Sequence, residues 1–389
     1  MNRDAVIVSA VRTAIGKQGG ALATIPAHVF GAEVLKEAIR RANVEPGEID
    51  DVIMGNVISG GGNIARLTAL QAGLSLELPG MTIDRQCGSG INAVNLAAQA
   101  IRAGNGDVYL AGGIESMSRA PYLMDRPEKS YSPVPPRFRK SQLSPKEIGD
   151  PPMGITAENL AEKYSISREE QDEFSLSSQR KMAYAMEDGR FEKQIVPITI
   201  PVKKGDPFLF KRDEHPRPQT TLEALSKLQP AFLQGGTVTA GSSSGLNDAA
   251  AALVVMSREK AAELDVKPLA VIREQALAGV DPNIMGIGPV PAVRKVLEKS
   301  RLTLDDMDLI EINEAFAAQV IACNRELNMD MEKVNVNGGA IAHGHPLGAT
   351  GAILITKAVY ELERRGGRYA LITACIGGGQ GIATIIERE

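Results

Sequence analysis

Residues 80–94 read Gly-Met-Thr-Ile-Asp-Arg-Gln-Cys-Gly-Ser-Gly-Ile-Asn-Ala-Val. Residues 80–84 are typical of a short strand, and a glycine-rich turn follows at Cys87. Beyond the turn, apolar side chains recur at helical spacing, at Ile91, Val94, Ala98 and Ile101. A strand that turns through glycines into a helix is the repeating unit of α/β proteins, so this stretch predicts an α/β fold.

The same alternation extends to both sides and divides the chain into two similar halves. Strands are predicted at 5–10, 51–55, 107–111, 269–273, 307–312 and 369–375. The strands at 51–56 and 308–313 both end in Asn, and the next candidate residues, Cys87 and His343, follow 31 and 30 residues later. This pattern predicts two α/β domains related by pseudo-symmetry, with Cys87 and His343 in corresponding turns that face each other.

The middle of the chain has a different composition. Residues 121–152 carry 8 of the 22 prolines and several basic side chains, which predicts a loop. A helix is expected over 167–188, with Ser167 and Glu170 forming a capping box. We expect an N-terminal domain of residues 1–116 plus 247–268, an inserted domain of 117–246 and a C-terminal domain of 269–389.

Composition narrows the class of protein. The net charge of −4 argues against a nucleic-acid-binding protein, and no run of 18 apolar residues predicts a membrane span. The first residues lack the basic leader of a signal peptide, so we expect a cytoplasmic protein. Three cysteines suit a reducing compartment, and the absence of CxxC and HExxH spacings predicts no metal site.

Cys87 is the first candidate for chemistry. It precedes a helix, where the dipole and free N–H groups favour a thiolate, and its own N–H could stabilise an oxyanion. The alternative is a buried cysteine in a tight turn. Cys375 ends a strand before three glycines and is a candidate acid or base with a lowered pKa, unless it only packs in the core. Cys323 lies in an apolar helical stripe, where packing is the better interpretation.

Two of the four histidines occur together, in Ala342-His343-Gly344-His345-Pro346. Glycine offers no packing, so a structural pair is the less favoured interpretation. His343 could deprotonate a thiol, and His345 is expected to support the turn. Asn313 could hold a water or a carbonyl oxygen, or could simply cap the helix that follows it. No role is assigned to His28.

Taken together, four motifs resemble the thiolases, the acetyl-CoA C-acyltransferases. They are Cys87-Gly-Ser-Gly, Asn313-Glu-Ala-Phe, Gly344-His-Pro-Leu-Gly and Cys375-Ile-Gly-Gly-Gly-Gln-Gly, and the likeness covers the chain from end to end. The resemblance implies a five-layer αβαβα fold of two pseudo-symmetric domains with an inserted loop domain. It also implies reversible cleavage of 3-ketoacyl-CoA, or condensation of two acetyl-CoA molecules, with no tightly bound cofactor.

The resemblance also implies residue roles. Cys87 would be the acylated nucleophile, His343 its base, and Cys375 the group that exchanges a proton with the acetyl-CoA methyl. Asn313 would hold a water that forms one oxyanion site together with His343. The N–H groups of Cys87 and Gly377 would form the other site.

Coenzyme A thioesters would bind to the inserted domain. Ser244 would hold the pantetheine arm and Arg217 the nucleotide end, with a pocket lined by Met153, Phe232, Ala240, Ala315 and Phe316. The basic 121–146 stretch resembles a tetramer-forming loop, so a homo-oligomer, dimer or tetramer, is expected. Pro152 stands where some short-chain relatives have His, and Gly88 stands where many relatives have Ala or Ser.

Two other functions compete with this one. A condensing enzyme of the ketoacyl synthase type would have one cysteine with His-His or His-Asn partners, and Cys375 argues against it. An inactive thiolase-fold protein that binds acyl-CoA or lipid would not need both cysteines, His343 and Asn313.

Overall fold

The computed structural model describes residues 3–127, 129, 131, 133–202 and 205–389. The strands are β1 (Ala5–Thr13), β2 (Gly16–Lys17), β3 (Asp51–Gly55), β4 (Met81–Ile83), β5 (Val108–Ser116), β6 (Ile195–Val196), β7 (Ile198–Ile200), β8 (Phe208–Phe210), β9 (Asn247–Ser257), β10 (Ala270–Gly279), β11 (Leu309–Ile312), β12 (Tyr369–Ile376) and β13 (Gln380–Glu387). The helices are α1 (Ala27–Ala42), α2 (Ile64–Gln71), α3 (Ser89–Arg102), α4 (Met153–Lys163), α5 (Arg168–Glu187), α6 (Leu222–Ser226), α7 (Arg258–Glu263), α8 (Pro289–Ser300), α9 (Ala317–Leu327), α10 (Ala340–His343) and α11 (Leu347–Arg365).

The expected internal repeat is confirmed by the strand order. The first half has the order β1-β9-β5-β3 and the second half has β10-β13-β12-β11, so corresponding strands occupy corresponding places. The halves meet where β1 and β10 pair antiparallel, at Val6–Val271 and Ile7–Ala270. Two copies of one topology therefore lie side by side about the β1–β10 junction.

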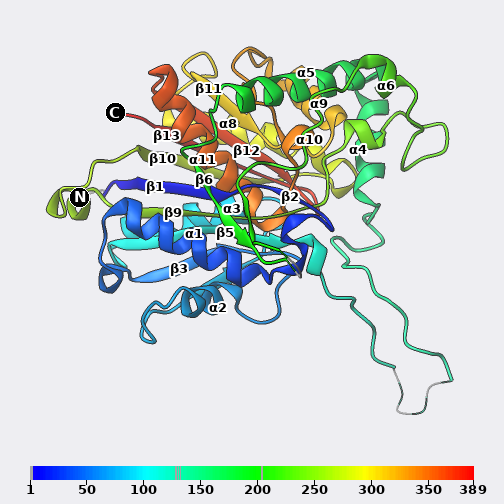
Figure 1. Cartoon of the computed structure of the whole chain (residues 1–389). Coiled ribbons are helices and arrows are strands. Elements are labelled where there is room, and N and C mark those ends of the chain that lie inside the picture. The colour runs from blue at the N-terminus through cyan, green and yellow to red at the C-terminus, as the bar shows by residue number, and fades with distance from the viewer. Residues whose placement is uncertain (1–2, 128, 130, 132, 203–204) are drawn as a thin grey trace.

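Helices complete a layered α/β arrangement (Figure 1). Helix α1 covers the outer face of the first half-sheet with α2 beside it, and α8 covers the second with α9 beside it. Helices α3 and α11 pack against each other and contact strands of both halves. Their buried side chains, among them Ile91, Val94, Ile353 and Leu354, form the central apolar core. These contacts correspond to the expected sequence of five layers.

Glycines permit the close approach of the two central helices. A Cβ added to Gly351 would lie 2.2 Å from the backbone nitrogen of Ile91, and one on Gly90 would lie 2.6 Å from that of Ala352. Backbone therefore touches backbone at the beginnings of α3 and α11. The turns that precede these helices, at Cys87 and at His345, are brought to the same region by this contact.

Most predicted strands are found within a few residues of their expected bounds, but β13 was missed. It follows Gly377-Gly378-Gly379 at once and pairs with both β10 and β12. Because both of its faces are buried, Gln380–Glu387 lacks the polar–apolar alternation that marks a half-exposed strand. Strand β9 was missed for the same reason, since all of its residues from Asn247 to Ser257 are buried.

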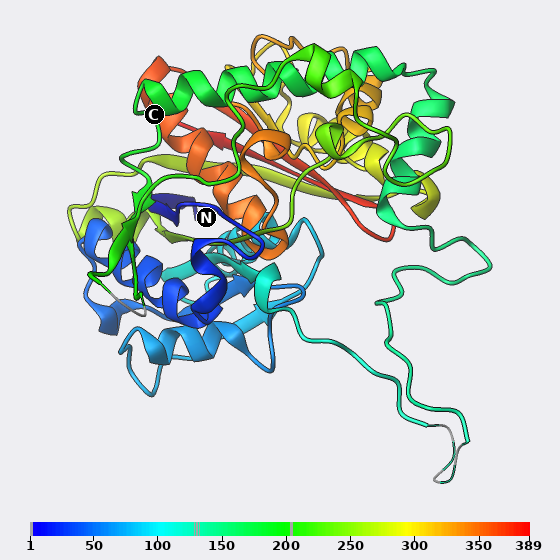
Figure 2. The ribbon, with the colours of Figure 1, turned by 45° about the vertical axis from the view of Figure 1, so that its right-hand side comes forward.

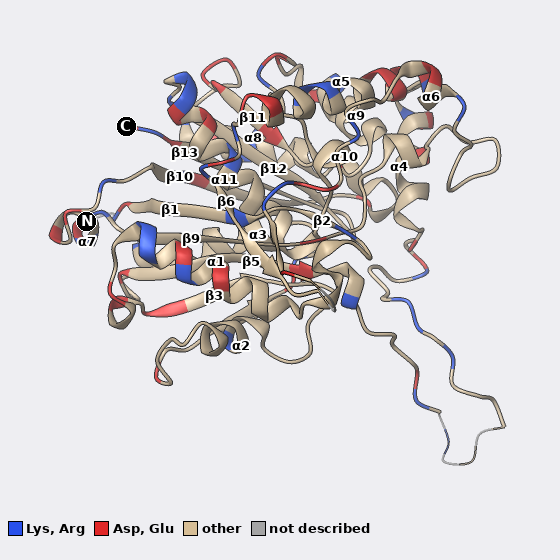
Figure 3. Ribbon diagram, viewed as in Figure 1, with Lys and Arg blue, Asp and Glu red and all other residues tan. Residues whose placement is uncertain are grey.

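The segment between the halves packs mainly on the second half, with α4 and α5 both contacting α9, and α5 contacting α10. The expected capping box at the start of α5 is present. The described residues of 120–146 form an extended arm that stands away from the body in both views (Figures 1 and 2). Residues 123–125 pair with 137–139 along it. Figure 3 shows that Lys and Arg predominate among the charges of this arm.

Candidate active site

The turn that carries Cys87 is held by short local hydrogen bonds. Gln86 adopts a left-handed conformation with φ of 44°, and its N–H donates to Asp84 Oδ1 at 2.7 Å. Ser89 Oγ accepts from the N–H of Arg85 at 2.8 Å and donates to the Gln86 carbonyl at 2.7 Å. Left-handed backbone is unusual for a residue other than glycine, and these hydrogen bonds hold Gln86 in it. The turn therefore presents the thiol at the beginning of α3.

The C-terminal half meets this turn through Ile376 and Gly377. A Cβ on Gly88 would lie 2.6 Å from Ile376 Cδ1, so the two turns are in direct contact. The N–H groups of Gly377 and of Cys87 itself are hydrogen-bonded to the Cys87 sulfur and act to lower its pKa. The structure therefore brings Cys87 and Gly377 together, although they lie far apart in the sequence.

Cys375 is the second thiol of the site. It is buried at the end of β12. A negative charge on Cys87 helps to raise its pKa, so the two sulfurs interact electrostatically. It belongs to a small apolar cluster with Met153, Ala315 and Phe316. Three of the residues expected to line the pocket thus surround Cys375.

The expected lowering of the two cysteine pKa values is wrong for this structure. Burial raises the pKa of the Cys87 thiol to about 11, despite the opposing N–H groups. Burial, with the neighbouring Cys87, raises the pKa of Cys375 well above its ordinary value. Removing a thiolate from water costs more free energy here than the hydrogen bonds from backbone N–H groups recover, so both cysteines are neutral thiols in the free protein.

The pairing of Asn313 with His343 is also wrong. The imidazole beside Asn313 belongs to His345, whose Nε2 lies 3.4 Å from Asn313 Nδ2. His345 Nδ1 lies 2.7 Å from Thr350 Oγ1, and that hydroxyl donates its own proton to the Pro346 carbonyl at 2.9 Å. His345 Nδ1 therefore carries the ring proton and Nε2 is the basic nitrogen. Burial lowers the pKa of His345 to about 4, so the ring is neutral.

Asn313 is not the cap of the following helix. Helix α9 has Phe316 at its N-cap, and Asn313 directly follows β11, with its N–H donating to the Thr373 carbonyl at 2.9 Å. Its side chain is fully buried, and Oδ1 has no hydrogen-bond partner among the described residues. A buried amide oxygen without a partner suits a water or a substrate group, which was the functional alternative for this residue.

His343 was expected to be the base of Cys87 and to share an oxyanion site with Asn313. Its Nδ1 donates to the Gly344 carbonyl at 2.9 Å, and its Nε2 is buried without a partner among the described residues. Burial, with the positive charges of Lys357 and Arg12, lowers the pKa of His343 well below its usual value. The sequence did not show which of the two histidines lies beside Asn313, because Gly344, at φ of 101°, turns the chain between them.

The turn with His345 lies beside the turn with Cys87. The carbonyl oxygen of Gly348 would be 2.7 Å from a Cβ on Gly55 and 3.1 Å from one on Gly90. Gly348 follows His345 by three positions, and Gly90 follows Cys87 by three positions. The geometry therefore brings together one thiol, one neutral imidazole and a pair of backbone donors, with a second thiol and an amide nearby. Such a set can support acyl transfer through a covalent thioester.

The other expected pocket residues come from the inserted segment. The rings of Phe232 and Phe316 meet edge to face, with centroids 5.9 Å apart. Ser244 is partly buried, and its N–H donates to the Ala315 carbonyl at 3.0 Å. Ala240 is exposed at the start of a short turn, Ala240–Ser242. These contacts join Phe232 and Ser244 of the inserted segment to Phe316 and Ala315, and so form one wall of the apolar cluster around Cys375.

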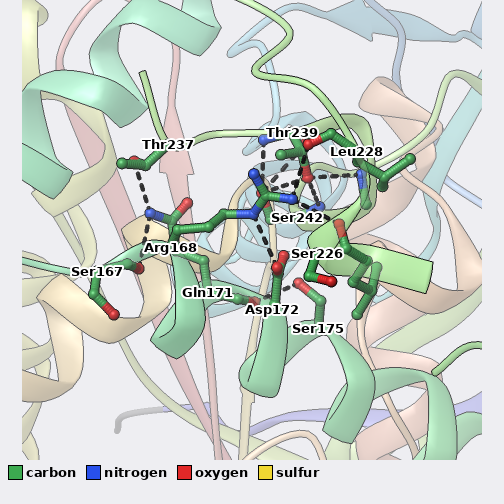
Figure 4. Close-up of polar contacts among 12 residues, drawn as sticks. Ser167, Arg168, Gln171, Asp172, Ser175, Ser226, Leu228, Thr237, Thr239 and Ser242 are labelled. Carbon is green, nitrogen blue, oxygen red and sulfur yellow. Dashed lines mark hydrogen bonds and ion pairs between the residues drawn. The ribbon is translucent and has the colours of Figure 1, made fainter. Parts of the chain in front are cut away.

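Helix α5 supports this wall (Figure 4). Arg168 makes an ion pair with Asp172 at 2.9 Å and donates to the carbonyls of Leu225 and Leu228. Gln171 donates to Thr237 Oγ1 at 2.9 Å. The loop that leads to Ala240 is thereby tied to a helix that itself packs on the second half.

Arg217 lies in the segment between β8 and α6. Its side chain is exposed, and it makes no ion pair in the described part of the chain. Its backbone N–H donates to Gln179 Oε1 at 2.9 Å. An unpaired surface guanidinium can bind phosphate, so the position is compatible with the expected contact to a nucleotide.

Sequence reasoning missed two residues that shape the site. Leu143 comes from the arm, and its Cδ1 would lie 2.9 Å from a Cβ on Gly377. Nothing in a proline-rich loop marks such a contact. Glu314 received no role from the sequence, but its buried carboxylate accepts from Ser178 Oγ at 2.7 Å and Asn335 Nδ2 at 2.8 Å. The motif Asn-Glu-Ala-Phe could have indicated this role.

Two searches of the described residues complete the picture. No helix of this part of the chain is both long and apolar enough to cross a bilayer. Within the same residues, no group of three or more His, Cys, Asp or Glu side chains is arranged to hold a metal ion.

Comparison with known proteins follows the same lines. A family model described as "Thiolase, N-terminal domain" matches residues 5–259, and one described as "Thiolase, C-terminal domain" matches residues 266–388. The acetyl-CoA acetyltransferase of Cupriavidus necator is 49% identical over 396 residues, which cover 99% of this chain and 100% of that protein. A probable acetyl-CoA acyltransferase of Staphylococcus epidermidis is 45% identical, with 98% of each chain covered.

Solved structures agree over the whole length. The acetyl-CoA acetyltransferase of Bacillus anthracis has a TM-score of 0.96 and 46% identity, with 100% of both chains covered. Human mitochondrial 3-ketoacyl-CoA thiolase in complex with CoA has a TM-score of 0.93 and 44% identity, covering 100% of this chain and 98% of that one.

Proposed function

This chain belongs to the thiolase family and is an acyltransferase, and from that premise we propose that Cys87 carries the acyl group and that His345, rather than His343, is its base. Cys375 is the second proton carrier. The convergence of the Cys87 and Gly377 N–H groups on the Cys87 sulfur is the observation that supports this proposal most strongly. The substrates are CoA thioesters: a 3-ketoacyl-CoA in cleavage, or two acetyl-CoA molecules in condensation.

Before cleavage, Cys87 and His345 are both uncharged. As Cys87 Sγ bonds to the 3-keto carbon, its proton passes to His345 Nε2, and the carbonyl oxygen becomes an anion held by the N–H groups of Cys87 and Gly377. Collapse breaks the bond between carbons 2 and 3 and expels the enolate of acetyl-CoA. The enolate oxygen accepts from protonated His345 and from a water held by Asn313 Oδ1. Each such donor is typically worth ~2.7–4 kcal/mol in the transition state.

The balance of protons makes Cys375 first an acid and then a base. The Cys375 thiol protonates the enolate carbon, which releases acetyl-CoA and leaves a Cys375 thiolate. That thiolate then takes the proton of an incoming CoA thiol. The CoA sulfur attacks the acyl-Cys87 thioester, and the expelled Cys87 thiolate recovers its proton from His345. Every group returns to its resting state, and the reverse sequence is the condensation.

The resting pKa values fit this order of events. With a thiol near 11 and an imidazole near 4, an ion pair between Cys87 and His345 is unfavourable in the free enzyme. The imidazolium becomes favourable only when negative charge forms on a substrate oxygen beside it. Stabilisation is thereby concentrated in the transition state, where it accelerates the reaction.

We extend the proposal to the substrate-binding segment. Residues 117–246 form the CoA-binding domain, carried between 1–116 and 247–268, and residues 269–389 form the C-terminal domain. Ser244 contacts the pantetheine arm and Arg217 the phosphates. The acyl chain is bounded by Met153, Phe232 and Phe316, with Ala240 and Ala315 completing the wall.

Assembly and cellular setting belong to the same proposal. The arm exposes Tyr122 and Phe138 at 87% and 73%, and their ring centroids lie 5.4 Å apart with the ring planes tilted by 52°. Aromatic side chains so exposed are typical of a contact surface, so we propose that the arm joins copies of this chain. The three free cysteines, two of them adjacent in the site, suit a reducing compartment such as the cytoplasm.

Peptide mass spectrometry tests the nucleophile. Incubation with acetoacetyl-CoA, without free CoA, should leave an acetyl group on the peptide with Cys87. An adduct confined to the Cys323 peptide would contradict the assignment. The Cys375→Ala variant should still be acylated but should lose exchange of the acetyl-CoA methyl protons with deuterated water, and undiminished exchange would remove Cys375 from the mechanism.

Chain-length preference has its own test. Cleavage rates are measured for 3-ketoacyl-CoA substrates from C4 to C16, for the parent chain and for Phe232→Ala. If Phe232 bounds the acyl chain, the variant should gain activity on longer substrates relative to C4. An identical profile for both proteins would exclude Phe232 from the acyl pocket.

A further inference from the structure

His343 is a buried histidine that the proposed mechanism does not use. It is 2% exposed, and its Nδ1 lies 2.9 Å from the carbonyl oxygen of Gly344. A carbonyl only accepts hydrogen bonds, so Nδ1 carries the ring proton. Nε2 is then a bare acceptor, and it has no partner within the described residues. The whole polar function of this side chain is therefore directed at one backbone carbonyl.

That carbonyl belongs to the peptide unit that leads into His345. The N–H of the same unit, on His345, donates to Asn247 Oδ1 at 2.9 Å. Asn247 is fixed in turn, because its Nδ2 donates to the Gly16 carbonyl at 3.0 Å. Both polar ends of the Gly344–His345 peptide are thus held by side chains, one from α10 and one from β9.

The peptide needs this support because of its conformation. Gly344 has φ of 101° and ψ of 172°, a region essentially restricted to glycine. A Cβ at this position would fall 2.3 Å from the Asn247 amide, so glycine is required and no side chain of its own can hold the turn. Glycine leaves the backbone free to rotate unless hydrogen bonds restrain it.

We propose that His343 is a positioning residue, whose Nδ1–H orients the Gly344–His345 peptide and through it the imidazole of His345. The inference rests on the proposed role of His345 as base. Hydrogen bonds to Thr350 and Asn313 fix the ring itself. The two hydrogen bonds from His343 and Asn247, together called the clamp, fix the backbone from which the ring projects, so the clamp acts on the reacting geometry.

Loss of the clamp should therefore affect kcat and leave KM unchanged. Misplacement of a catalytic group by about 1 Å can cost on the order of 100-fold in rate, so a partial loss of restraint predicts a decrease of about tenfold. A purely structural role would instead lower the amount of active enzyme and leave the turnover of each active site unchanged.

Three substitutions separate these possibilities. His343→Asn places an amide nitrogen where Nδ1 stands, His343→Gln places one where Nε2 stands, and His343→Leu removes both. The clamp predicts kcat within about threefold of the parent for Asn, and a decrease of about tenfold for Gln and Leu, at unchanged KM. Activity is measured as acetoacetyl-CoA cleavage and is divided by the number of sites that acquire an acetyl group.

Two further variants complete the series. Thr384→Val removes another buried hydrogen bond, 2.9 Å to Asn95 Oδ1, and should leave kcat per active site unchanged. His345→Gln tests the underlying assignment and should lose nearly all activity. Parental kcat in the Gln and Leu variants, or equal losses in Asn and Leu, would overturn the clamp while His345→Gln remained inactive. Parental kcat in His345→Gln would instead overturn the base on which the inference rests.

Discussion

At the scale of single residues, the site consists of groups that rest uncharged. Cys87 and Cys375 are thiols because burial raises their pKa values, and His345 is neutral because burial lowers its pKa. An ion pair in this pocket before substrate binds would cost desolvation free energy that no interaction with substrate offsets. Neutral partners are stable in the free enzyme and separate charge only when a substrate oxygen can share it.

The reactivity of Cys87 should therefore depend steeply on pH. Only the thiolate reacts with iodoacetamide, and with a pKa of about 11 its fraction rises about tenfold for each pH unit between 7 and 9. Alkylation of the Cys87 peptide, followed by mass spectrometry in the Cys375→Ala background, should show this slope. A rate that is constant above pH 7 would indicate a preformed thiolate.

The neutral His345 also links stability to acid pH. Its folded pKa of about 4 lies below the ordinary 6.5, so the unfolded chain binds the proton first as the pH falls. The stabilisation is complete above pH 6.5 and is lost as the pH falls through 4, by about 3 kcal/mol at most. Urea denaturation of His345→Gln should show a decrease over this range that is smaller by that amount. Parallel curves for parent and variant would contradict the linkage.

At the scale of elements, the decisive contact is that between α3 and α11. The two helices begin at the two reactive turns, and glycines on both let their backbones touch. The distance between Cys87 and His345 is therefore set by helix packing, since each side chain stands a few residues before a rigid helix. A substitution that strains the packing of α3 against α11 should therefore lower kcat.

Gly351→Ala tests this dependence. The new methyl would lie 2.2 Å from the Ile91 backbone nitrogen, so the helices must separate. Overpacking of this kind costs about 1–3 kcal/mol of unfolding free energy, and kcat should fall with it. Gly47→Ala is the matched control, because a Cβ there has no atom within 4 Å. Equal effects of both substitutions in chemical denaturation and in kcat would show that the crossing does not position the site.

At the scale of the whole molecule, two copies of one topology share a seam at β1 and β10, and each half contributes one reactive turn. The first half supplies Cys87, and the second supplies His345, Asn313, Cys375 and Gly377. The inserted segment then closes one side, with α4 and α5 resting on the second half. With the proposed residue roles, catalysis would require both halves, so neither half alone should be active.

The arm provides the test of assembly. Replacing Tyr122 and Phe138 together by Ser removes two exposed rings without touching the core, so the mass from light scattering should fall below that of the parent oligomer. Tyr184→Ser, which removes a ring of 61% exposure on α5, should leave the mass unchanged. A double variant with the parental mass would exclude these rings from the contact between copies.

Local patterns in the sequence were sufficient for the alternating strands and helices, the repeat of two halves, the capping box of α5 and the motifs that mark the family. These features depend on neighbours in the chain, where spacing and residue type decide the outcome. Tertiary structure alone decided which of the two histidines faces Asn313. It also decided the missed strand β13, the contact of Leu143 with Gly377 and the neutral state of both thiols. Each depends on burial and on atoms contributed by distant segments, because desolvation and close packing are set by what surrounds a residue in space.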